Sequence, residues 1–182
     1  AETPRHEGLL TALGGGFTQY AYAFVQQQAE RVEDEDLDRA RELQLRARNL
    51  YLRGRDYALR GLEVRHAGLG AALAADPGAA VARTTPADVP LLYWCAASWA
   101  GAIAQAKDDP VLVGDLPKVE ALVDRALVLD EGWNRGALHG LMITYEMSRV
   151  TGEGDPVERA TRHFRRAVEL GGGRMASPYV AY

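Results

Sequence analysis

The sequence has a single cysteine and almost no lysine. Cys95 is its only thiol in 182 residues, which excludes an internal disulfide framework and a multi-cysteine metal site. Lys107 and Lys118 are its only lysines, so arginine carries most of the positive charge. The formal net charge is −4. Because no basic field is present to attract phosphate groups, we expect no nucleic-acid partner.

Sequence signatures of catalysis and of cofactor binding are also absent. The chain has no Gly-x-Ser-x-Gly elbow, no phosphate-binding loop and no His-Glu-x-x-His motif, and its four histidines are scattered. The glycine run "LGGGF" lies on a helical pattern and does not follow a strand. The acidic run at 33–36 lacks the spacing of a calcium loop. We therefore expect no enzyme, no cofactor and no metal.

One stretch, "VPLLYWCAASWAGAIAQA" at 89–106, carries no charge. Eighteen residues are short for a membrane span, Pro90, Ser98 and Gln105 interrupt the stretch, and no positive cluster flanks it. A helix that is apolar on every face is instead surrounded by other helices. No targeting segment is visible. We expect the chain to be a fragment of a longer protein, truncated at both ends.

The remaining periodicity predicts helices throughout, with no strand alternation. In the first helix, the apolar stripe Leu10, Leu13, Phe17, Tyr20 and Phe24 predicts the core face. In the second, Asp36 is expected to cap the N-terminus, and small residues alternate with large ones at Ala40, Leu43, Ala47, Leu50, Gly54, Tyr57 and Gly61. Glycines 171–173 are expected to close the last long helix. The expected helices span about 4–32, 37–66, 86–106, 115–129, 133–149 and 156–170. The segment 74–90 is expected to be mainly a connector, with a short turn of helix at Ala79–Ala82.

Two segments, 119–130 and 160–171, align without a gap. Ala160, Phe164 and Ala167 follow the small–large–small spacing of the second helix of a tetratricopeptide repeat. Ala126 and Ala167 are 41 residues apart, more than the roughly 34 of a standard repeat. The predicted fold class is therefore all-α, with divergent tetratricopeptide-type helical hairpins packed as a right-handed α-solenoid with long inter-helix loops. One domain is expected over 1–182, with repeat pairs at about 4–66, 86–129 and 133–170.

Aromatic side chains on these helices are the candidates for a ligand site. Trp94 and Trp99 are five residues apart, roughly 140° around a helix axis, so they point in different directions. For any one tryptophan, core packing is the commoner role. The candidate ligand-binding residues are Tyr22, Tyr93, Trp94, Trp99, Trp133, His139 and Tyr145.

Three segments together resemble the TatT family, the T component of tripartite ATP-independent periplasmic (TRAP) transporters: "DVPLLYWCAASWAGAI", "GDLPKVEALVDRALVLDEGWNRGALHGLMITYE" and "HFRRAVELGGG". The resemblance runs from about Thr3 to the end. It implies a bacterial periplasmic protein, lipid-anchored through an N-terminal cysteine outside this chain. It also implies helical repeats around a ligand-sized channel and an extracytoplasmic substrate-binding protein as partner. Glu131 stands where a proline commonly closes the repeat, and Thr3-Pro4 resembles the end of an earlier repeat.

Two classes of function remain open. The first is a non-catalytic periplasmic accessory subunit of a TRAP-type transport system, which binds a small, partly apolar organic ligand, docks the substrate-binding protein, or does both. A homo-oligomer is compatible with it. The alternative is a generic tetratricopeptide scaffold that binds a peptide or partner protein along its concave face. A closed internal channel would favour the first class, and an open groove would favour the generic scaffold.

Overall fold

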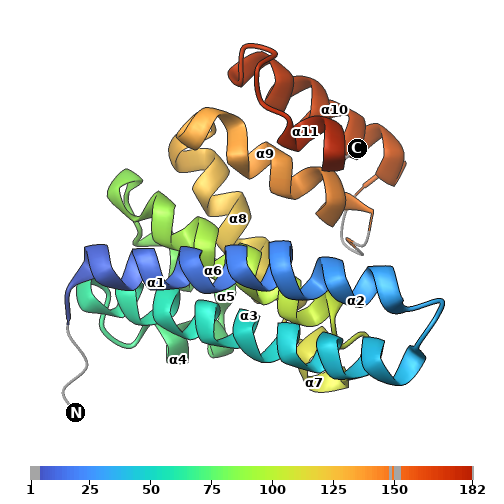
Figure 1. The fold of residues 1–182 in the computed structure, drawn as a ribbon. Helices are drawn as coiled ribbons and strands as arrows, with labels where there is room; N and C mark the ends of the chain where they lie inside the picture. The colour runs from blue at the N-terminus through green and yellow to red at the C-terminus, as the bar shows by residue number, and fades with distance from the viewer. Residues whose placement is uncertain (1–4, 148, 150–152, 182) are drawn as a thin grey trace. The chain divides into compact units, whose positions relative to one another are not determined.

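The computed structural model describes residues 5–147, 149 and 153–181. These residues form helices and connecting turns, with no strand among them, which confirms the all-α prediction (Figure 1). The chain divides into two compact units, one ending at Arg125 and the other beginning at Ala126. We call them the first and second units. The boundary falls inside α8 (Leu116–Asp130). The single helical-repeat domain over 1–182 stays a prediction.

The first unit begins with a long antiparallel helical hairpin (Figure 1). Its first arm is α1 (Glu7–Tyr20), continued by the π-helical segment η1 (Ala21–Gln26) and by α2 (Gln27–Val32). Its second arm is α3 (Leu37–Arg65). The Asp36 carboxylate accepts a hydrogen bond from the Arg39 backbone N–H at 2.9 Å, which confirms the predicted cap. The predicted start of the first helix at Pro4 lies outside the described residues.

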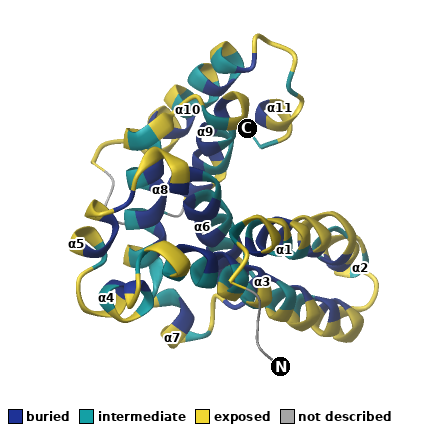
Figure 2. Cartoon of the chain, turned by 90° about the vertical axis from the view of Figure 1, so that its left-hand side faces the viewer, coloured by how far each residue is buried: buried dark blue, intermediate teal, exposed yellow. Residues whose placement is uncertain are grey.

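The predicted core face of the first arm was right for Leu10, which is buried, and wrong for its large rings. Tyr20 and Phe24 are exposed and stack on each other with ring centroids 5.3 Å apart, while Phe17 is half-buried against Tyr57. The buried stripe is displaced by about one residue, which rotates it by roughly 100°. Smaller residues on this stripe let the first arm lie close to α3, and large rings do not. The buried residues of the arm are Leu10, Gly14, Gly15, Thr18, Ala21, Val25 and Ala29 (Figure 2).

After α3 the chain passes through several short helices. α4 (Leu69–Ala75) was not predicted, α5 (Pro77–Ala82) includes the short turn predicted at Ala79–Ala82, and the 3-10 turn η2 (Pro86–Asp88) lies at the predicted start of the next helix. The uncharged stretch then forms α6 (Val89–Ala104), followed by α7 (Pro110–Val113). α6 packs against both α1 and α3, which explains why it is apolar on every face.

Small residues set the spacing where α1, α3 and α6 meet. A Cβ atom on Gly61 would lie 2.5 Å from a methyl carbon of Leu91, and one on Gly101 would lie 2.6 Å from the ring of Tyr51. The predicted small-residue face of α3 is confirmed for Ala40, Ala47, Gly54 and Gly61, all buried. The short axial distances allow the large side chains beside these glycines to fill the grooves between helices.

The second unit contains α9 (Trp133–Glu146), α10 (Pro156–Leu170) and α11 (Ser177–Ala181). The bounds of α10 match the prediction, and Gly172 and Gly173 close it with positive φ angles of 61° and 69°. α9 ends at Glu146, three residues before the predicted end. Its first turn contains a left-handed stretch, Asn134 to Gly136, and at Gly136 a Cβ atom would lie 3.1 Å from that of Leu170.

Candidate functional site

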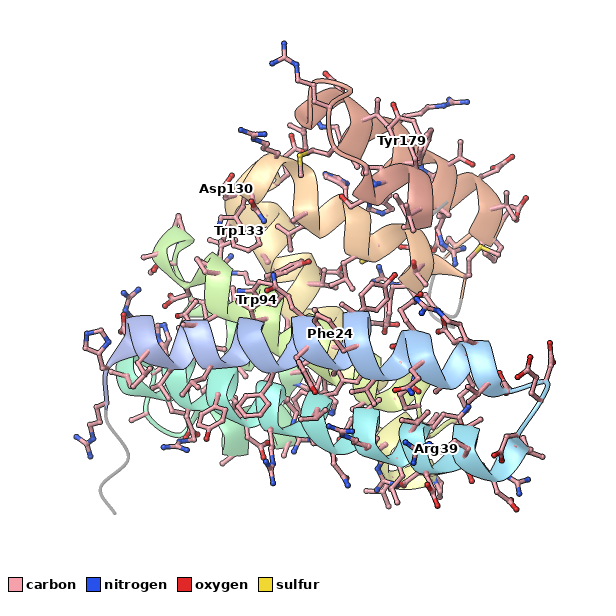
Figure 3. All side chains as sticks on the ribbon, viewed as in Figure 1. Phe24, Arg39, Trp94, Asp130, Trp133 and Tyr179 are labelled. Atoms are coloured by element: carbon pink, nitrogen blue, oxygen red, sulfur yellow. The ribbon has the colours of Figure 1, made fainter. Side chains whose placement is uncertain are left out.

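An open groove of about 540 Å³ lies between α1 and the η2–α6 segment of the first unit. Trp94, half-buried, lies along it (Figure 3). A Cβ atom on Gly15 would lie 2.8 Å from the Trp94 indole, so only glycine lets this ring lie against α1. At Gly16, by contrast, no atom lies within 4 Å of a Cβ position. The lining residues are Glu7, Gly8, Thr11, Ala12, Gly15, Gly16, Gln19, Ala87, Pro90, Leu91 and Trp94.

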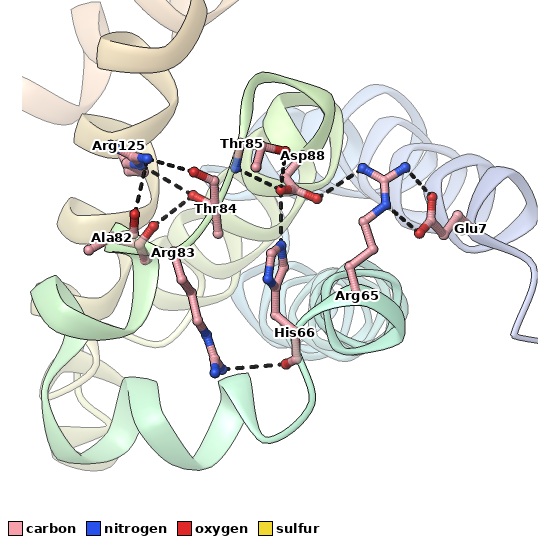
Figure 4. A network of polar contacts seen from close by, with 10 residues as sticks. Glu7, Arg65, His66, Ala82, Arg83, Thr84, Thr85, Asp88 and Arg125 are labelled. Carbon is pink, nitrogen blue, oxygen red and sulfur yellow. Dashed lines mark hydrogen bonds and ion pairs between the residues drawn. The ribbon is translucent and has the colours of Figure 1, made fainter.

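The groove wall at Glu7 is fixed by a polar network that is centred on the buried Asp88 (Figure 4). Arg65, the last residue of α3, donates from Nε to the Glu7 carboxylate at 2.6 Å and from a terminal nitrogen to Asp88 at 3.2 Å. Asp88 is fully buried and also accepts from the Thr85 backbone N–H at 2.8 Å. The His66 ring nitrogen lies 3.0 Å from its second oxygen. The network therefore joins α1, the end of α3 and the turn that leads into α6.

Burial and hydrogen bonding act in opposite directions on Asp88. Burial alone would raise the pKa of its carboxyl group. The hydrogen bonds from the Thr85 backbone, from His66 and from the Thr85 hydroxyl outweigh burial, and the pKa lies below its usual value. The carboxylate therefore remains charged at neutral pH and holds its donors in place.

A second set of contacts holds the connector to α8. The Arg125 guanidinium donates to the backbone carbonyl oxygens of Thr84 at 2.6 Å and Ala82 at 3.1 Å (Figure 4). Arg83 reaches the His66 carbonyl oxygen at 3.4 Å. The carbonyls of Ala82 and Thr84 lie at the end of α5, where a helix leaves acceptors without intrahelical partners. The backbone that leads into η2 and the groove is thus held by Arg125 of α8, and Arg83 ties the same connector to the end of α3.

The model of one protein family, the TRAP transporter T-component, matches residues 1–182 of this chain. The chain belongs to the TRAP transporter T-component family. It is therefore an accessory component of a TRAP transport system, as the sequence resemblance indicated. No curated protein matches the chain.

Two of the predicted site residues of this T-component lie beside Trp94 on α6 and differ in their surroundings. Tyr93 is half-buried, with its ring edge-on to Trp94 at a centroid distance of 4.8 Å, and burial raises the pKa of its phenol. Trp99 is buried, and its indole N–H donates to Asp115 at 3.2 Å. The Arg55 guanidinium lies over its ring at 4.9 Å. Trp99 thus has the packing role that is commoner for a tryptophan.

The other predicted site residues do not line the groove. Tyr22 is exposed on η1. Trp133 is half-buried at the start of α9, and Tyr145 is buried near the end of the same helix. His139, also on α9, is buried and lies against His163 of α10. Of the seven candidates, only Trp94 is a groove residue.

Sequence reasoning missed the α1 side of the groove. Thr11, Gly16 and Gln19 lie on α1 and line the groove together with residues of α6, which is far away in the sequence. One signal was present: three consecutive glycines inside a helix destabilise it, so they indicate a close contact or an exposed hollow. Gly14 lies close to Ala58 and Gly15 lies close to Trp94, whereas Gly16 borders the groove.

The described part of the chain contains neither a metal-binding cluster nor a membrane-spanning helix. Within 5–147, 149 and 153–181, no group of three or more His, Cys, Asp or Glu side chains is arranged to hold a metal ion. Over the same residues, no helix is both long and apolar enough to cross a bilayer.

Proposed function

We propose that this T-component is a non-catalytic accessory subunit whose α1–α6 groove docks a partly apolar segment of the extracytoplasmic substrate-binding protein. The observation that carries the proposal is the groove itself, which is open and has Trp94 along its length. A tryptophan with aliphatic neighbours and a polar rim is a common anchor in protein interfaces. Leu91 and Pro90 supply the aliphatic surface, and Thr11 and Gln19 supply the rim.

A small organic ligand is the second candidate for the same groove. Its volume, about 540 Å³, falls within the range of small-molecule sites. The half-buried indole of Trp94 offers a flat apolar face to such a ligand. An open groove favours the docked segment, because small ligands usually bind in sites that enclose most of their surface.

The finer features implied by family membership belong to the same proposal. We place the protein in the periplasm, lipid-anchored through an N-terminal cysteine outside this chain, with a homo-oligomer compatible with docking. We also propose repeats of tetratricopeptide type arranged as a right-handed solenoid, and the packed helical pairs α1–α3 and α9–α10 support the helical hairpins of such repeats. A generic peptide-binding scaffold would share this architecture but would not prefer the transporter's own binding protein.

Gly16 provides a sharp test, because a side chain there enters the groove without touching the core. We expect Gly16→Trp to weaken binding of the transporter's substrate-binding protein by at least about tenfold, measured by calorimetry, since one lost interface anchor is worth about 1–2 kcal/mol or more. Gly16→Ala is the matched control and should bind like the wild type. Trp94→Ala should reproduce the loss. Unchanged affinity in Gly16→Trp and Trp94→Ala would refute docking in this groove.

The same variants separate the two candidates. Binding of the apolar fluorophore anilinonaphthalene sulfonate, with native mass spectrometry of the purified protein, reports on small ligands. A bound small molecule that is lost in Gly16→Trp, together with unchanged affinity for the binding protein, would favour the second candidate. Loss of protein binding without any bound small molecule would favour the first.

A further inference from the structure

The second unit contains a pair of buried histidines that the proposed function does not use. His139 of α9 and His163 of α10 face each other through their Nδ1 atoms, which lie 2.8 Å apart. At that distance one nitrogen carries the hydrogen and the other accepts it. The two imidazoles thus form a direct hydrogen bond between the two main helices of the unit.

The outer nitrogen of each ring faces a carboxylate. His139 Nε2 lies 3.3 Å from Glu131, and His163 Nε2 lies 3.7 Å from Glu146. Each carboxylate already has a guanidinium partner. Glu131 pairs with Arg166, and Glu146, itself buried, accepts from Arg159 at 2.5 Å. The charged groups around the pair are therefore Glu131 from the turn before α9, Glu146 from α9, Arg149 from the following loop, and Arg159, Arg162 and Arg166 from α10.

The pair can accept one proton without breaking its link. With three hydrogens on four ring nitrogens, each Nε2 donates toward its carboxylate and one hydrogen remains between the Nδ1 atoms. A second added proton would place two N–H groups head to head at 2.8 Å, so the link would break. The arginines have already neutralised the two carboxylates, so little negative charge remains to offset a doubly charged pair.

We propose that the His139–His163 pair is a pH-sensitive link that holds α10 on α9 near neutral pH and releases it in mildly acidic surroundings. Burial lowers the pKa of His139, and Glu131 offsets this only in part. Burial also lowers the pKa of His163, and the neighbouring charge of His139 lowers it further. Arg166 holds the pKa of Glu131 below its usual value, so that carboxylate stays ionised through the transition.

The direction of the effect follows from these lowered pKa values. In the unfolded chain both histidines take up protons as pH falls through about 6.5, whereas the packed pair resists them. The unfolded or detached state therefore binds more protons below that pH, and the stability of the second unit falls as pH falls. Well above about pH 6.5 both states are neutral at these positions, and the link is fully formed.

Hydrogen exchange on the whole chain tests the proposal. We expect the amide protection factors of α10 to fall by at least about threefold between about pH 7.5 and about pH 5.5, because an unfolded histidine is about ten times more often protonated than neutral at about pH 5.5 and the packed pair resists that protonation. In His163→Gln, which keeps a donor but cannot charge, the fall should be clearly smaller than in the wild type, because only His139 is left to take up a proton. His6→Gln, which alters an exposed histidine of the first unit, should behave as the wild type does.

Two results would overturn the proposal. One is an α10 protection factor in the wild type that does not change over this pH range. The other is the same fall in His163→Gln, which would assign the effect to His139 alone or to groups outside the pair. Should His163→Gln fail to fold, nitrogen NMR of the wild-type imidazoles decides. Titration of His139 and His163 with the midpoint of a histidine in an unfolded chain, at about pH 6.5, would contradict a shared proton.

Discussion

Asp88 is the residue through which three segments of the first unit are connected. It is fully buried, and its carboxylate accepts hydrogen bonds from Thr85, His66 and Arg65. A buried charge is tolerated only when its lone pairs are occupied, and here they are. Its effect reaches the groove because the same Arg65 also holds Glu7.

We expect Asp88→Asn to lower the free energy of unfolding by about 2–4 kcal/mol at neutral pH, because Arg65 loses a charged partner and an amide cannot accept every donor. Urea unfolding monitored by circular dichroism measures this. Asp34→Asn, at an exposed position of the same unit, is the control and should change little. Because the folded pKa of Asp88 is lowered, its contribution is complete above the ordinary value of 3.8 and is lost as pH falls further. A difference between variant and wild type that grows on acidification would contradict this assignment.

In the second unit, Arg159 is the buried charged residue that connects neighbouring segments, as Asp88 does in the first unit. Its side chain is buried, pairs with the buried Glu146, and donates to the carbonyl oxygen of Gly154 at 2.7 Å. We expect Arg159→Leu to destabilise the second unit by about 3 kcal/mol, because Glu146 would keep its charge with fewer donors. Arg165→Leu, on an exposed position of the same helix, should cost less than about 0.5 kcal/mol. Equal effects of the two variants on thermal unfolding would exclude a special role for the buried pair.

At the scale of elements, the spacing of helices in the first unit is set by small residues. A Cβ atom on Gly54 would lie 2.8 Å from the Ser98 hydroxyl, 2.9 Å from that of Thr18 and 3.1 Å from the Gly14 carbonyl oxygen. Atoms of three residues from two helices therefore occupy the space that a side chain at position 54 would need. Because one of them is backbone, the contact cannot be relieved by a side-chain rotation alone.

Two glycine-to-alanine substitutions should consequently have opposite signs. Gly54→Ala is expected to destabilise the protein by about 1–3 kcal/mol through overpacking. Gly16→Ala, with no atom within 4 Å of its Cβ position, is expected to stabilise it by about 0.5–1 kcal/mol through helix propensity. Urea midpoints of the two variants against the wild type provide the measurement. Stabilisation by both would show that α1, α3 and α6 are less closely packed than described.

The long helices were predictable where the chain carries its own end signals. Asp36 caps α3, and Pro156 with the glycines after Leu170 bounds α10, so local chemistry alone located these ends. The short helices α4 and α7 were missed, and α5 was predicted only as a short turn, because the alanines, glycines and prolines of these segments resemble a connector. The core face of the first arm was misassigned because periodicity gave most weight to its large rings. Packing against α3 selects the small residues instead.

The candidate site was less predictable than the helices, because the residues that form it come from segments far apart in the sequence. Trp94 was identified from its residue type, but the groove exists only because Gly15 and Gly16 of α1 lie opposite it. His139 was weighed as a ligand-binding residue, yet its partner His163 is 24 positions away. Such pairings arise from tertiary packing, and no periodicity within one helix reveals them.

At the scale of the whole molecule, each unit contains its own titrating centre. The first unit has Asp88, whose pKa is lowered from 3.8. The second has His139 and His163, whose pKa values are both lowered from 6.5. In both cases a lowered folded pKa means that stability is lost as pH falls, but the two windows do not overlap.

We therefore expect acidification to destabilise the two units one after the other. Hydrogen exchange at about pH 7, 5 and 3 should show α9 and α10 losing protection first, while α1, α3 and α6 remain protected until the pH drops below the ordinary value for aspartate. His163→Gln should reduce the first loss and leave the second, and in Asp88→Asn the first unit should already be weakened at neutral pH. Simultaneous loss of protection in both units at one pH would mean that they unfold as a single cooperative body, and the separate assignment of the two centres would fail.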